Sequence, residues 1–81
     1  MSSGAFHNSH QRELARAFSH AEFTVHELWL AYFALGGDVG PLEVEAYLNG
    51  LMPLPEFQHN ILALAVNERL NELRPARAPY Y

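Results

Sequence analysis

The chain has 81 residues, of which 49% are apolar and 17% charged, and its formal net charge is −4 at pH 7. A chain this short forms one domain at most, and such a domain buries only roughly 60% of the surface of its unfolded chain. The charged fraction is below the roughly 25% of an average soluble domain, which excludes a disordered polyelectrolyte. The excess of apolar side chains indicates a surface that contacts a partner.

Several classes of protein are excluded by what the chain lacks. It contains no cysteine, which excludes disulfide bonds, thiolate nucleophiles and cysteine zinc sites. No segment approaches the roughly 20 apolar residues that span a bilayer. Residues 1–11 lack the basic and then apolar order of a signal peptide. We therefore expect a cytoplasmic protein without a membrane segment. All basic residues are arginine, a usage that favours a GC-rich, bacterial genome.

The negative charge is concentrated in the middle of the chain. Residues 24–50 contain Glu27, Asp38, Glu43 and Glu45 but no lysine or arginine. An acidic segment repels the phosphates of nucleic acids. Nucleic-acid binding is therefore disfavoured, although a local basic patch elsewhere would be compatible with the negative total.

The pattern of apolar residues predicts an all-α protein, a small four-helix bundle. We expect a flexible lead at residues 1–8, a single helical domain at residues 9–74 and a Pro-rich tail at residues 75–81. The first helix is predicted at about residues 9–21, because apolar residues recur there at spacings of three and four. These residues are Leu14, Ala17, Phe18 and Ala21.

The second helix, predicted at residues 24–35, has the strongest local signal. Thr24 and Glu27 have the spacing of a capping box, in which each side chain accepts a hydrogen bond from the backbone amide of the other residue. Phe23 and Leu28 occupy the two positions of a hydrophobic staple.

Eight consecutive residues of this segment, 28–35, are apolar. Eight residues make about two helical turns, so every face of the helix is apolar, and such a helix is buried all round. A buried strand is the competing interpretation of a short apolar run, but the capping box favours a helix. Gly36 and Gly37 can end it with a left-handed cap. One subunit of this size cannot cover all these faces, and we therefore expect a dimer.

The third helix is predicted at residues 41–49, with Pro41 in its first turn and Gly50 after its end. Residues 42–47 also alternate between apolar and polar side chains, as a strand would. A helical stripe and good helix formers favour a helix here, and the stripe consists of Val44, Tyr47, Leu48 and Leu51.

The fourth helix is predicted at residues 55–74, after a stiff connector with Pro53 and Pro55. Pro75 ends it. Its apolar arc is wider than a single coiled-coil seam and comprises Phe57, Ile61, Leu62, Leu64, Ala65, Val66, Leu70 and Leu73.

Neither a catalytic set nor a metal site stands out. His20, Glu22, His26 and Glu27 could supply metal ligands around one turn, but solvent-facing or capping histidines are the simpler interpretation. The single aspartate, Asp38, lies in a Gly-rich turn, and no serine lies in a nucleophile motif. We expect no enzymatic activity, no cofactor and no bound metal.

The sequence favours a protein–protein interaction module. Aromatic residues and methionine are enriched in the cores of interfaces, and Glu43 and Glu45 would attract a basic partner. We therefore predict a self-associating regulatory protein that forms a homodimer and acts on another protein. The expected apolar anchors are Trp29, Tyr32, Phe33, Met52, Leu54 and Phe57.

A helix-turn-helix transcriptional regulator is the alternative hypothesis. Residues 42–49 and 55–73 have the outline of this motif. Gln58 and Asn60 could read base edges near the start of the second helix. Glu56 would repel phosphate, however, and no arginine follows until the last part of that helix.

Overall fold

The computed structural model describes residues 9–73; the predicted lead, residue 74 and the predicted tail lie outside this range. The described residues contain four helices and no strand, which confirms the all-α class and the helical interpretation of residues 28–35 and 42–47. The described helix ends differ from the predicted ones by at most one residue. The helices are α1 (Ser9–His20), α2 (Val25–Ala34), α3 (Pro41–Leu48) and α4 (Glu56–Leu73).

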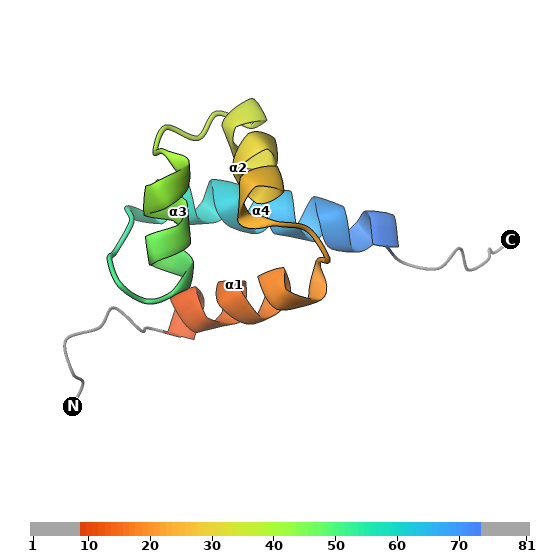
Figure 1. Ribbon diagram of the computed structural model, residues 1–81, viewed down its shortest axis with the longest axis horizontal. Coiled ribbons are helices and arrows are strands. Elements are labelled where there is room, and N and C mark those ends of the chain that lie inside the picture. The colour runs from red at the N-terminus through yellow and green to blue at the C-terminus, as the bar shows by residue number, and fades with distance from the viewer. Residues whose placement is uncertain (1–8, 74–81) are drawn as a thin grey trace, which may run out of the picture.

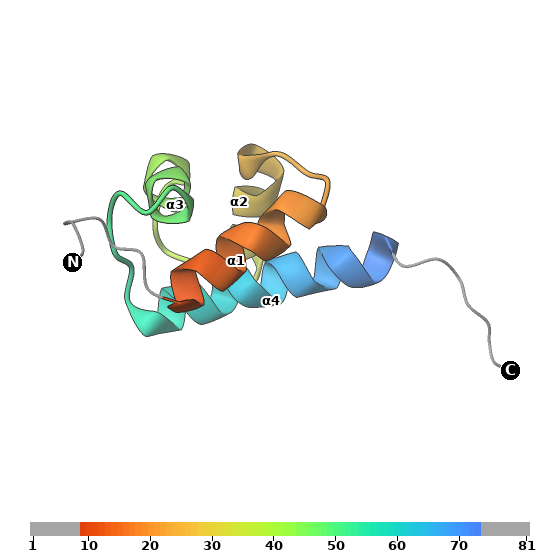
Figure 2. The ribbon, with the colours of Figure 1, turned by 90° about the horizontal axis from the view of Figure 1, so that it is seen from below.

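The helices form two layers that cross each other steeply. α1 and α4 run along the long axis of the molecule, and α2 and α3 lie across it (Figure 1). Figure 2 shows α2 and α3 nearly end-on above the layer of α1 and α4. Between the layers, α1 packs against α3 and α2 packs against α4. The arrangement thus differs from an up-and-down bundle, in which the helices lie nearly parallel or antiparallel.

Helix length accounts for this crossing. With 18 residues, α4 is about 27 Å long at the helical rise per residue. α2 has 10 residues and α3 has 8, so neither can cover α4 lengthwise. Placed side by side across the long layer, the two short helices cover more of its length than either could alone.

The core lies where the two layers meet. α2 contributes Leu28 and Tyr32, both fully buried, and α3 contributes Val44. α4 presents a stripe at helical spacing to the same core, formed by Ile61, Leu62, Ala65 and Val66. The apolar face of each helix is thus buried by one helix of its own layer and one of the other layer, and such packing is the usual source of helix stability in proteins.

The local signals at the ends of α2 and α3 agree with the predictions. The Glu27 amide donates to the Thr24 hydroxyl at 3.0 Å, and the Thr24 amide donates to the Glu27 carboxylate at 2.8 Å, which confirms the capping box. Gly36 and Gly50 follow α2 and α3 with φ angles of 104° and 74°. Such left-handed backbone favours glycine.

None of the four helices, which all lie within residues 9–73, combines the length and the hydropathy that crossing a membrane requires.

Candidate interaction surface

One side of α2 is apolar and open to solvent. Leu30 and Phe33 lie one turn apart and remain 50% and 58% exposed. The rings of His26, Trp29 and Phe33 follow one another along the same side, with centroid separations of 6.2 Å and 5.3 Å. We call these four residues, His26, Trp29, Leu30 and Phe33, the α2 face.

The α2 face exists because α2 is apolar on both sides. Leu28 and Tyr32 are four residues apart and turn toward α3 and α4, where they are fully buried. Residues on the other side of the same helix then project away from the core. The sequence therefore supplies a second apolar surface after the core has been filled.

Tyr32 belongs to the core and offers no surface to a partner. Its hydroxyl donates a hydrogen bond to the side-chain oxygen Oε1 of Gln58, and it accepts hydrogen bonds from the backbone amides of Asp38 and Val39 at 3.1 Å and 3.0 Å. The same side-chain oxygen of Gln58 also accepts a hydrogen bond from the backbone amide of Asp38, at 3.1 Å. This network satisfies the buried polar groups of α2 and α4 and fixes the turn between α2 and α3.

Trp29 links the α2 face to this turn. Its indole N–H donates to the Val39 carbonyl oxygen at 2.8 Å, so one edge of the ring is held. The side chain is half-buried, and its ring stacks with the exposed Phe33. Trp29 is thus both a support and a contact residue of the α2 face.

The other predicted anchors lie away from α2. Met52 and Leu54 are half-buried in the connector between α3 and α4, whereas Phe57, in the first turn of α4, is 66% exposed. Glu43 and Glu45 are exposed on α3. The six apolar anchors therefore do not form one patch: Trp29 and Phe33 share a face, Tyr32 is buried, and the other three follow α3.

Two buried glutamines were not anticipated. Gln58 completes the buried stripe of α4, because it precedes Ile61 and Leu62 by three and four residues. Gln11 precedes Leu14 in the same way on α1, and its side-chain amide donates to carbonyl oxygens at the end of α3. Helical spacing alone, without regard to polarity, would have found both. Since Gln58 is buried, it cannot read base edges as the helix-turn-helix hypothesis requires.

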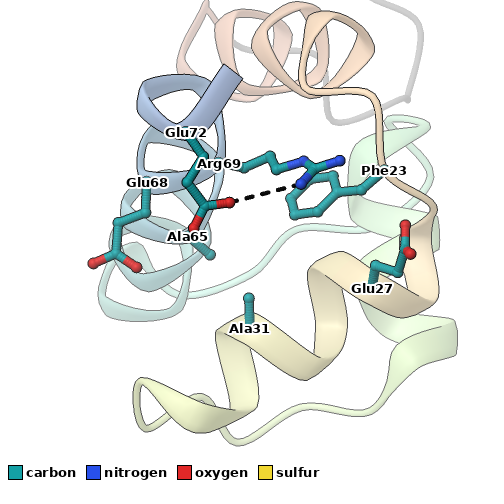
Figure 3. A pocket seen from close by; sticks show the side chains of 7 residues that line it. All are labelled: Phe23, Glu27, Ala31, Ala65, Glu68, Arg69 and Glu72. Atoms are coloured by element: carbon teal, nitrogen blue, oxygen red, sulfur yellow. Dashed lines mark ion pairs between the residues drawn. The ribbon is translucent and has the colours of Figure 1, made fainter. Parts of the chain in front are cut away.

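A hollow of about 220 Å³ opens between α2 and α4. Figure 3 shows the small side chains of Ala31 and Ala65 pointing into it from the two helices. Arg69 reaches from α4 across to Phe23, with its guanidinium carbon 5.4 Å from the ring centroid. The space stays open because Ala31 and Ala65 are small where the helices cross, and Arg69 spans from α4 to Phe23 at its side.

Three of the four charged residues around this hollow, Glu27, Arg69 and Glu72, are engaged in structural contacts. Arg69 donates to the carbonyl oxygens of Ala21 and Glu22 at 3.0 Å each and lies 3.6 Å from the Glu72 carboxylate. Glu27 belongs to the capping box, and Glu68 points away from the other labelled side chains (Figure 3). The arrangement stabilises the corner between α1 and α2 and does not converge on a reacting centre, which acid–base chemistry needs.

Three histidines lie in two further places. His10 and His59 stack at the meeting point of α1 and α4, with a centroid separation of 5.7 Å. His20, near the other end of α1, bonds the Arg16 carbonyl oxygen. Within residues 9–73, no three histidine, aspartate or glutamate side chains gather closely enough to hold a metal ion.

The chain matches no protein-family model, and neither curated proteins nor solved structures show a significant similarity to it.

Proposed function

We propose that the protein is a non-enzymatic interaction module that self-associates through the α2 face. The observation that carries this proposal is the exposure of Leu30 and Phe33 on a well-capped helix. Burying apolar surface contributes about 25 cal/mol per Å². Each apolar residue of the α2 face that a partner covers thus favours association.

A second copy of the chain suits this face. A two-fold axis that runs beside the α2 face would place the α2 faces of two subunits against each other, as most homodimers do with a self-complementary patch. Trp29 and Phe33 would then contact aromatic rings of the partner, and aromatic pairs add about 0.5–1.5 kcal/mol beyond area burial.

Such a dimer would be reversible. A stable complex buries roughly 800 Å² on each partner, and one side of a 10-residue helix supplies less than this. A monomer released from the dimer exposes the same apolar face to a second protein. Exchange between a second copy and another protein suits a regulatory role, and exposed Glu43 and Glu45 favour a partner with a basic surface.

Sedimentation equilibrium of three proteins tests self-association. The wild type should show a dimer fraction that rises with concentration in the micromolar range. Phe33→Glu should remain monomeric, because a carboxylate would be buried without a partner. Leu42→Glu is the matched control, since this leucine is 76% exposed on α3 and should dimerise like the wild type.

Two results would refute the proposal. If the wild-type protein stays monomeric across the micromolar range, it does not self-associate. A dimer that Leu42→Glu weakens as much as Phe33→Glu does would place the interface away from the α2 face.

A further inference from the structure

Three helices, α1, α3 and α4, meet at a junction of aromatic rings. His59 of α4 stacks on His10 of α1, and the Tyr47 ring of α3 meets His59 edge-on at 5.8 Å. The Tyr47 hydroxyl lies 2.7 Å from Nδ1 of His59. A titratable ring on α4 therefore contacts both of the other helices.

Gln11, the residue after His10, holds the same turn of α1 against the end of α3. The Gln11 side-chain amide donates to the carbonyl oxygens of Tyr47 and Leu48, at 3.0 Å and 2.8 Å. These carbonyl groups belong to the last turn of α3, where intrahelical donors are lacking. His10 and Gln11 together thus dock the start of α1 on α3 and α4.

Protons can reach the stacked rings from two sides. One surface hollow of about 220 Å³ and another of about 230 Å³ are both lined by His10 and His59. The first also contains Glu13 of α1, and the second contains Tyr47 and Glu56. His59 can therefore be protonated without unfolding of the junction.

The surroundings of His59 oppose its protonation. Partial burial and the neighbouring His10 lower its pKa from the ordinary 6.5, and they outweigh the carboxylates of Glu56 and Glu13, which act in the other direction. Tyr47 faces His59 from α3 as a neutral phenol, since burial raises its pKa above 10.0. Leu54, in the connector before α4, adds an apolar wall.

We propose that this junction is a pH-sensitive latch, which loosens the start of α1 when the His59 ring becomes positively charged against the stacked ring of His10. The hydrogen bond to Tyr47 need not break, because a protonated Nδ1 donates to the phenol oxygen where a neutral one accepts from it. The cost instead comes from two like charges in stacked rings and from the partial burial of one of them.

The sign of the pH dependence follows from linkage. A histidine whose folded pKa is lower than its unfolded pKa binds fewer protons in the folded state. Docking of α1 is therefore strongest above pH 6.5. It weakens as the pH falls below that value, until His59 is also protonated in the folded state. The pH change lowers the ratio of docked to loosened forms by about tenfold for each unit by which the pKa of His59 is lower in the docked form than in the loosened form.

The test combines an NMR titration of the histidine rings with hydrogen exchange at about pH 7.5 and about pH 5. In the wild type, His59 should titrate below 6.5. At the lower pH, α1 amides should lose protection relative to α4 amides after correction for intrinsic exchange. His10→Phe keeps an aromatic ring but removes one charge, so it should raise the pKa of His59 and reduce the loss of protection.

His20→Gln is the matched control, because His20 is exposed near the other end of α1. This variant should leave the pKa of His59 and the exchange pattern unchanged. The latch would be refuted if His59 titrated at or above 6.5 in the wild type, or if α1 and α4 lost protection equally. A His10→Phe variant with an unaltered pKa of His59 would also refute it. Should that substitution disturb folding, His10→Gln repeats the test without a bulky ring.

Discussion

At the scale of single residues, the Tyr32 ring lies directly against the backbone of Gly37. The chain leaves α2, turns back over the buried ring and hydrogen-bonds its hydroxyl through the amides of Asp38 and Val39. A Cβ atom on Gly37 would overlap the ring. The ring cannot withdraw, because Tyr32 is fully buried. Glycine is required here by space, since the second glycine of the pair has no left-handed φ.

Gly37→Ala should therefore lower the free energy of unfolding by about 1–3 kcal/mol, the cost of overpacking a filled core. Urea denaturation followed by circular dichroism measures it. Combining Gly37→Ala with Tyr32→Leu gives a double-mutant cycle, because the smaller side chain removes the overlap. Costs that simply add in the double variant would contradict the close approach.

The sequence did not show which aromatic residue of α2 would be buried. Trp29, Tyr32 and Phe33 lie on an all-apolar segment, whose periodicity gives no preferred side. Tyr32 is buried because its hydroxyl meets Gln58, a residue far along the chain. A pairing of this kind depends on how the helices cross, which single-sequence patterns do not contain.

At the scale of helices, local signals were the reliable ones. The capping box, the glycines after α2 and α3 and the proline that starts α3 depend on residues within one or two turns, and the structure contains all of them. The wide apolar arc of α4 was less informative. Phe57 and Leu64 belong to this arc but remain largely exposed, because the crossing helices cover only one side of α4.

Removal of the capping box should weaken α2 directly. Thr24→Ala leaves the Glu27 amide without its side-chain acceptor, and the loss of such a cap costs about 0.5–2 kcal/mol. Thermal unfolding monitored by circular dichroism checks this value. Thr24→Ser retains the hydroxyl and should unfold close to the wild type; equal losses in both variants would show that the methyl group matters and the cap does not.

At the scale of the whole molecule, Arg69 holds together parts that the helices alone do not join. The backbones of α1 and α2 do not pack against each other, and they are connected by a corner in which Glu22 has a positive φ of 58°. Arg69 reaches this corner from α4, donates to the Ala21 and Glu22 carbonyl oxygens and lies over the Phe23 ring. One side chain thus ties the α1–α2 corner to the long helix.

Arg69→Lys should lower the free energy of unfolding by about 1.5 kcal/mol, the lower end for hydrogen bonds to charged groups. A lysine keeps the charge but cannot donate to two carbonyl groups with a planar fork. Arg12→Lys, on the exposed side of α1, is the control and should have little effect in the same urea titration. If both variants unfolded alike, the positive charge alone would account for the role of Arg69.

The two-layer arrangement also constrains the order in which the chain can fold during its synthesis. Among consecutive helices, only α2 and α3 bring their backbones together; α1 and α2 do not, and neither do α3 and α4. In the nascent chain, α1 can contact α3 and α2 can contact α3, but the core side chains of α1 and α2 that pack against α4 stay exposed until α4 leaves the ribosome. Completion of the domain is a late event, and it depends on the last of the four helices to be made.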